Sequence, residues 1–344
     1  MVSPLAEGAL LLASLFVPFV LLLLAFPPYL RYLTRLGRVS DDVHKSPPAK
    51  VPKPAGPLLF AAVLVGEGVV ALGFGSLFPA ALVLGGGVAF AVGLYDDLFV
   101  LGGKVKPLLL VLAGVAFVSL VGAGVHLYGS DIYFPILGDT APHFIIYTIL
   151  VVAAFPVVTN AFNMMDAFNG EISWFTLLTS LALAVGVALR ELFTQGFSPA
   201  RLASTLPLVG VSAAFLLYNR YPSRSFDGDS GSLMFGAMFA GLAVVGGIEV
   251  AAIIAIVPAI LNSFYTLSSV RGFVERRKMS SRPTYVGEDG LLHASTAKDA
   301  PNTLVRLILL ASPSTEEGLV TSIVALTVVS CAFSIAISFL TWVF

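Results

Sequence analysis

Charged residues are scarce in this chain. Only 11% of its 344 residues are Asp, Glu, Lys or Arg, and 57% are hydrophobic. Soluble domains carry about 25% charged residues, so a soluble globular fold is excluded. The formal net charge of −1 gives no basis for binding nucleic acid. The single cysteine, Cys331, excludes an internal disulfide. This composition is typical of a polytopic membrane protein.

Apolar runs long enough to cross a bilayer occur throughout the chain, and about 17–25 residues are needed for each crossing. They predict about ten transmembrane helices, near residues 5–27, 57–77, 79–95, 107–124, 144–160, 172–189, 203–218, 232–246, 247–270 and 318–343. We see no internal repeat and no low-complexity linker. The sequence therefore predicts an all-α polytopic membrane protein that forms a single domain over residues 1–344.

Basic residues are almost absent from one side of this topology. All but two of the 19 Lys and Arg residues fall in the loops after the first, third, seventh and ninth predicted helices. Only Arg190 and Arg201 fall on the other side. Cytoplasmic loops are enriched in Lys and Arg, so the basic face is predicted to be cytoplasmic and both termini to lie outside.

Three polar clusters converge on that basic face. Asp96 and Asp97 end the apolar run 80–92, where ionised groups are costly unless cations compensate them. Asn160, Asn163 and Asp166 recur every three residues, which places amide and carboxylate oxygens on one helix face. The third cluster is the string 227–232, Asp-Gly-Asp-Ser-Gly-Ser, directly before an apolar helix.

These clusters suit phosphate chemistry. A glycine-rich helix start favours phosphate, and a carboxylate there is explained by Mg²⁺, which takes one or two protein oxygens and completes its shell with substrate phosphates. The last basic loop, 271–282, supplies arginines that could clamp a diphosphate. We therefore predict Mg²⁺-dependent chemistry on phosphates at the cytoplasmic face, with a soluble diphosphate and a lipid as substrates.

The motifs, in this order and spacing, resemble the polyprenyl-phosphate N-acetylhexosamine-1-phosphate transferase superfamily (glycosyltransferase family 4). Gly-Leu-Tyr-Asp-Asp at 93–97 is similar to the family's Gly-Phe-x-Asp-Asp, and the strings at 160–170 and 218–232 look like its next two motifs. Tyr-Pro-Ser-Arg at 221–224, Asp-Val-His-Lys at 42–45 and Val-Pro-Lys-Pro at 51–54 look like the UDP-GlcNAc:dolichyl-phosphate branch. The absence of a long insertion in the last loop is similar to archaeal members.

The resemblance implies a role for individual residues. Asp229 and Asn163 match metal ligands, for Mg²⁺ or Mn²⁺, and either Asp96 or Asp97 deprotonates or orients the lipid phosphate. Lys106 matches a basic residue that faces the phosphates, and Phe226 looks like the residue that stacks on uracil. Arg282 is the best match for the diphosphate clamp, with Arg276 and Arg277 as alternatives. The remaining residues assigned to substrate binding are Asn219, Asn160, Asp166, Asn169 and Lys45.

The sequence departs from the family pattern at two places. Asp227 replaces a usually apolar residue, and Ala55-Gly56 stands where many members have Gly-Gly. Neither departure removes a catalytic group. The resemblance therefore implies transfer of N-acetylhexosamine-1-phosphate from a UDP-sugar to a polyprenyl phosphate in the cell membrane, and it allows a homodimer. The alternative is a transporter or flippase for a lipid phosphate or nucleotide sugar, which would also gather charged groups in a membrane protein.

Overall fold

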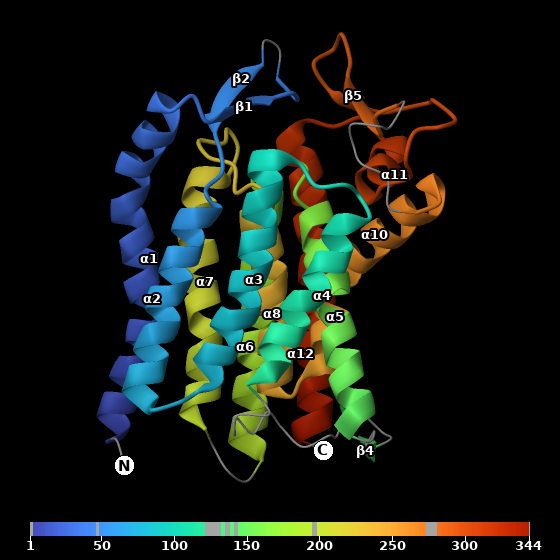
Figure 1. Cartoon of the computed structure of the whole chain (residues 1–344). Helices are drawn as coiled ribbons and strands as arrows, with labels where there is room; N and C mark the ends of the chain where they lie inside the picture. The colour runs from blue at the N-terminus through green and yellow to red at the C-terminus, as the bar shows by residue number, and fades with distance from the viewer. Residues whose placement is uncertain are drawn as a thin grey trace.

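The chain folds into a bundle of long, nearly parallel helices with three short hairpins at its ends (Figure 1). The computed structural model describes residues 3–45, 48–120, 132–134, 138–140, 144–194, 198–272 and 281–343. In chain order the elements are α1 (Pro4–Arg35), β1 (Val39–Asp42), β2 (Ala49–Pro52), α2 (Gly56–Phe74), α3 (Phe78–Phe99), α4 (Val105–Ser119), β3 (Ile132–Phe134), β4 (Gly138–Thr140), α5 (Phe144–Met164), α6 (Glu171–Phe193), α7 (Pro199–Asn219), α8 (Asp229–Gly246), α9 (Glu249–Ala255), α10 (Val257–Val270), β5 (Thr284–Val286), β6 (Leu292–Ala294), α11 (Leu304–Ala311) and α12 (Glu316–Val343).

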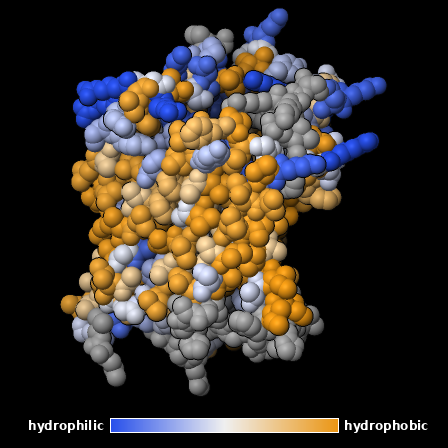
Figure 2. Space-filling model, viewed as in Figure 1, coloured by the Kyte–Doolittle hydropathy of each residue, from blue (hydrophilic) through white to orange (hydrophobic). Residues whose placement is uncertain are grey.

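Over the described residues, nine of the ten predicted membrane segments each coincide with one helix. Within the described residues, eight helices are long and apolar enough to cross a membrane, and α4 is a shorter apolar helix. An apolar band crosses the middle of the face shown in Figure 2, and hydrophilic residues gather above it. The prediction of an all-α polytopic membrane protein is confirmed.

The ninth predicted segment, 247–270, differs from the prediction because it is broken. It consists of α9 and α10, which meet at an angle of 65°. Pro258 lies at the start of α10 and has no N–H group, so it cannot continue the hydrogen-bond ladder of α9. As a result, α10 leaves the bundle sideways at the end that carries the β1–β2 and β5–β6 hairpins (Figure 1).

Helix α8 forms the centre of the bundle, where every residue after Asp229 is buried. Its small residues let neighbouring helices approach closely, as in other membrane bundles. Gly93 of α3 lies directly against the backbone of Asp229, where an added Cβ would overlap the carbonyl group. Gly236 is packed in the same way against Thr159 and Phe162 of α5. This packing fixes the start of α8 relative to α3 and α5.

Both termini lie at the same end of the bundle, opposite the β1–β2 hairpin and α11 (Figure 1). The ten predicted crossings are an even number, which requires both termini to lie at the same end. Which end faces the cytoplasm stays a prediction based on the distribution of Lys and Arg.

Candidate active site

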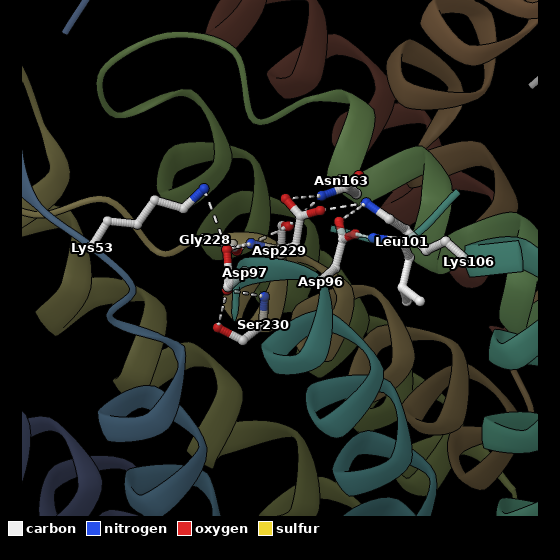
Figure 3. Close-up of polar contacts among 10 residues, drawn as sticks. Lys53, Asp96, Asp97, Leu101, Lys106, Asn163, Gly228, Asp229 and Ser230 are labelled. Atoms are coloured by element: carbon white, nitrogen blue, oxygen red, sulfur yellow. Dashed lines mark hydrogen bonds and ion pairs between the residues drawn. The ribbon is translucent and has the colours of Figure 1, made fainter. Parts of the chain in front are cut away.

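A side chain from α3 caps the first turn of α8 (Figure 3). The Asp229 N–H donates to Asp97 Oδ1 over 3.1 Å, and the Ser230 N–H and Oγ–H donate to Asp97 Oδ2 over 3.0 and 2.7 Å. Helix-start N–H groups lack partners within their own helix, and a carboxylate suits the positive end of the helix dipole. Gly228 has a φ of 76°, and an added Cβ would lie 2.6 Å from Asp97 Oδ2. Asp97 therefore determines where Asp229 is held.

Lys106, in the first turn of α4, joins Asp96 to Asp229. Its Nζ lies 2.6 Å from Asp96 Oδ2 and also donates to Asp229 Oδ2. The other Asp96 oxygen accepts from the Leu101 N–H. Successive residues on a helix point about 100° apart, so Asp96 and Asp97 face different partners. Asp96 faces the lysine at the pocket wall, whereas Asp97 is turned toward α8.

Asn163, in the last turn of α5, completes the surroundings of Asp229. Its amide donates to Asp229 Oδ1 over 3.3 Å and to Ser232 Oγ over 2.9 Å. Carboxylate and amide oxygens are the ligands that Mg²⁺ and Mn²⁺ accept in proteins. Rotation of the Asn163 amide group would turn its oxygen toward the Asp229 carboxylate. The donor set of Asp229 and Asn163 therefore fits a hard divalent cation.

Two further carboxyl groups, Asp166 and Asp227, lie beside this centre. Asp227 is fully buried, and neither of its carboxyl oxygens accepts a hydrogen bond from a described residue. Burial raises the pKa of Asp166 to about 6, although Lys53 opposes this effect. Burial and the charge of Asp166 raise the pKa of Asp227 well above its ordinary value. Asp227 is thus a buried carboxyl group beside the centre that no described hydrogen-bond donor reaches.

A cavity of about 760 Å³ lies at the end of the bundle that carries the β1–β2 and β5–β6 hairpins. The cavity brings together most of the predicted site residues, namely Asp96, Asp97, Lys106, Asn160, Asn163, Asp166, Asp229 and Arg282. Arg276 and Arg277 lie outside the described residues. Lys53 also lines the cavity, although it was not among the predicted site residues. The signals available in the sequence were its position between two prolines, three residues before α2, and its place in the Val-Pro-Lys-Pro string.

Four predicted substrate-binding residues lie apart from the cavity wall. Asn219 is buried, accepts from Ser173 Oγ over 2.6 Å and donates to the Ser225 carbonyl over 3.1 Å. Asn169 lines a second cavity of about 560 Å³ instead. The other two residues, Lys45 and Phe226, do not line the main cavity either. Their roles in substrate binding stay predictions.

Asn169 ties the loop after α1 to the start of α12. Its side chain donates to Asp42 Oδ2 over 2.9 Å, and its backbone N–H donates to Glu316 Oε1 over 2.9 Å. Lys45 Nζ lies 2.6 Å from Asp42 Oδ2. Burial raises the pKa of Asp42, but the hydrogen bonds from Lys45 and Asn169 outweigh burial and lower it overall. This network holds the β1–β2 hairpin against the α5–α6 turn.

Comparison with known proteins points to the same protein family as the sequence motifs. The family model described as "Glycosyl transferase family 4" matches residues 79–247. The phospho-N-acetylmuramoyl-pentapeptide-transferase of Moorella thermoacetica is 31% identical over 280 residues, which cover 75% of this chain and 81% of that protein.

Two further relatives have other substrates in their names. A Sulfolobus acidocaldarius protein, provisionally named UDP-N-acetylglucosamine--dolichyl-phosphate N-acetylglucosaminephosphotransferase, is 24% identical over 308 residues, which cover 87% of each chain. A Bacillus subtilis protein, provisionally named undecaprenyl-phosphate N-acetylglucosaminyl 1-phosphate transferase, is 23% identical over 285 residues, covering 82% of this chain and 76% of that protein. Because the Moorella thermoacetica protein is 31% identical and is covered over 81% of its length, and the family model matches residues 79–247, the chain belongs to glycosyl transferase family 4.

Proposed function

We propose that this protein transfers N-acetylhexosamine-1-phosphate, in the first place GlcNAc-1-phosphate, from a UDP-sugar to a polyprenyl phosphate of the dolichyl type. The products are UMP and a lipid-diphosphate-sugar, which would begin the assembly of an N-glycan-like glycan. The observation that carries this proposal is the grouping of Asp229, Asn163, Asp96 and Lys106 around one cavity at the end of membrane helices. The substrates in the relatives' names support it.

In the proposed reaction, an oxygen of the lipid phosphate forms a bond to the β-phosphorus of the UDP-sugar. The bond from that phosphorus to the bridging oxygen breaks, and UMP leaves with the electron pair. Both reactants are anions, so catalysis depends on neutralising charge and on alignment. Lys106 supplies positive charge between Asp96 and Asp229. Arg282 lines the same cavity and remains the best candidate for the diphosphate clamp.

Asp96 is the carboxylate that we assign to the lipid phosphate. Both oxygens of Asp97 accept hydrogen bonds from the first turn of α8, so Asp97 is committed to positioning Asp229. Asp96 lies against the ammonium group that would attract the phosphate. Asp229 and Asn163 would hold Mg²⁺, or Mn²⁺ in its place, and the bound ion would supply additional positive charge at the diphosphate.

We place the enzyme in the plasma membrane with its site facing the cytoplasm, where nucleotide sugars are available, and a homodimer is compatible with this arrangement. A transporter would usually bind its substrate near the middle of the bilayer, on broken helices. Here charged residues of the cavity come from helix ends, as Figure 3 shows for Asp96, Lys106 and Asp229. This placement favours an enzyme that works at the membrane surface.

The test is release of UMP from UDP-GlcNAc by the purified protein with dolichyl phosphate and Mg²⁺. We expect release that requires the lipid and stops with EDTA, and Asp229→Ala should abolish it while the protein stays folded. Release from a different UDP-sugar alone would keep the reaction and change the donor. If a folded protein releases no UMP from any donor, the transferase proposal fails and the transporter alternative takes its place.

A further inference from the structure

Lys53 enters the cavity from a loop that is fixed by its backbone. The loop joins β2 to α2 and runs beside the segment before α8. The Phe226 N–H donates to the Pro52 carbonyl over 3.1 Å, and the Ala55 N–H donates to the Phe226 carbonyl over 2.9 Å. These bonds lie on either side of Lys53. Its side chain is therefore presented to the cavity from a rigid support, as a binding group requires.

The Lys53 ammonium lies near several carboxyl groups, but it forms a close ion pair with one of them. Its nearest acid is Asp97, at 3.3 Å. The two Asp97 oxygens already accept three hydrogen bonds from Asp229 and Ser230. The Lys53 side chain remains 34% exposed, so its other N–H donors are open to the cavity.

The second lysine of the cavity is used differently. Lys106 is held between Asp96 and Asp229 and is 16% exposed. Figure 3 shows the two lysines approaching the Asp97–Asp229 centre from opposite sides. The chain that leads to Lys106 also supplies Val100 and Leu101 to the cavity wall, and these apolar side chains suit an isoprenoid chain. The lipid phosphate thus fits the Lys106 side, which leaves the Lys53 side for the other substrate.

The charge of the cavity makes a second cation important for an anionic donor. Among the described residues that line the cavity, the carboxyl groups outnumber the basic residues Lys53, Lys106 and Arg282, and Lys106 is already held between Asp96 and Asp229. A diphosphate entering this site is repelled unless a cation with spare donors meets it. Resting on the proposed function, we propose that Lys53 binds the diphosphate of the nucleoside-diphosphate sugar. Lys53 is thereby a further substrate-binding residue on the donor side of the site.

The test compares the affinities of the full-length protein for UDP and for uridine, measured by calorimetry with Mg²⁺. Lys53→Met should weaken UDP binding about tenfold or more, the usual cost of losing a charge-assisted hydrogen bond. Uridine binding should change less than about twofold, because uridine has no phosphate. Lys53→Arg should retain most of the UDP affinity. Lys50→Met, an exposed site on the same hairpin, is the matched control and should change neither affinity.

A second comparison separates contact with the diphosphate from a general effect of charge. If Lys53 only offsets nearby carboxylates, Lys53→Met/Asp166→Asn should bind UDP as well as Asp166→Asn alone. The proposal predicts that the double variant binds UDP about tenfold more weakly than Asp166→Asn alone. Equal loss of UDP and uridine affinity in Lys53→Met, or unchanged UDP affinity, would overturn the role of Lys53. If Lys53→Met does not fold, Lys53→Gln replaces it with the same expectation.

The outcomes also separate this proposal from the proposed function. A wild-type protein that releases UMP and binds UDP, with a Lys53→Met variant that binds it equally well, would refute only the role of Lys53. A folded wild-type protein that binds neither UDP nor uridine would overturn both.

Discussion

Asp96 and Asp97 are adjacent in the sequence but have different partners in the fold. Asp97 is almost fully buried and accepts hydrogen bonds from α8, whereas Asp96 faces Lys106. The motif alone left both residues open as the group that acts on the lipid phosphate. The structure distinguishes them because α8, which supplies the N–H groups, lies more than 100 residues away along the chain. No local pattern could have revealed that pairing.

Asparagine substitutions should distinguish the role of Asp96 from that of Asp97. An amide at position 97 can accept only through its oxygen and would direct its NH₂ group at the N–H donors of α8. We therefore expect Asp97→Asn to lower the free energy of unfolding by about 1–3 kcal/mol, in addition to reducing UMP release. Asp96→Asn should nearly abolish UMP release with a smaller loss of stability. The measurements are thermal unfolding in detergent and UMP release for both variants. If Asp96→Asn loses more stability than Asp97→Asn, the roles assigned to these two carboxylates are refuted.

Asp42 should contribute stability that depends on pH. Its pKa in the folded protein lies below the ordinary value of 3.8, because hydrogen bonds from Lys45 and Asn169 outweigh the effect of burial. A lowered carboxyl pKa gives stability that is present above 3.8 and lost as the pH falls through the folded pKa. We expect Asp42→Asn to be less stable than the wild type at neutral pH and to lack this part of the acid-induced loss. Unfolding midpoints measured from neutral to acidic pH test this.

The matched control for Asp42 is Asp41→Asn. Asp41 lies on the same strand but is exposed. The Asp41→Asn variant should therefore lose stability at acidic pH as the wild type does. Identical pH profiles for Asp42→Asn and the wild type would contradict the role of the Asp42 network.

Among the elements, the contact between α3 and α8 sets the geometry of the site. Gly93 lies against the Asp229 backbone, so Gly93→Ala should push α8 away. We expect a loss of about 1–3 kcal/mol in the free energy of unfolding, as for other overpacked cores, together with reduced UMP release. Gly68→Ala on α2 is the control, because an added Cβ there meets no atom within 4 Å. A Gly93→Ala protein as stable and active as the wild type would refute this contact.

The helices were largely predictable, whereas the irregular elements were not. Long apolar runs fix where membrane helices lie, because every backbone group inside a bilayer needs a partner in its own helix. The break between α9 and α10 depends on Pro258, which is a single residue in an otherwise continuous apolar run. The strands β1, β2, β5 and β6 have three or four residues each, too few to show an alternating pattern.

For the whole molecule, the charge asymmetry is sharper than the sequence alone indicated. The two basic residues on the side away from the site are both engaged within the protein. Arg201 Nη1 lies 2.5 Å from Glu191 Oε1, and Arg190 Nη1 donates to the Gly246 carbonyl over 2.7 Å. The basic loops near the site therefore carry the orientation signal, which strengthens the prediction that the site is cytoplasmic.

Cysteine labelling tests this orientation, because the only natural cysteine, Cys331, is buried. An impermeant maleimide applied to intact cells should label Ser3→Cys, near the N-terminus, and spare Lys50→Cys, on the β1–β2 hairpin. Inverted vesicles should give the opposite pattern. Labelling of Lys50→Cys from outside intact cells would place the site on the outer face, where it could not take a UDP-sugar from the cytoplasm.

The cap of α8 also has a consequence for how the protein is made. Asp97 and Asp229 are 132 residues apart in the chain. At a synthesis rate of about 5–20 residues per second, Asp97 waits roughly 7 to 26 s before its partners leave the ribosome. Throughout that interval a carboxylate lies at the membrane edge without the N–H groups that later surround it. The hydrogen bonds that hold Asp97 can form only after residues 229 and 230 have been made, so this part of the site is completed late in synthesis.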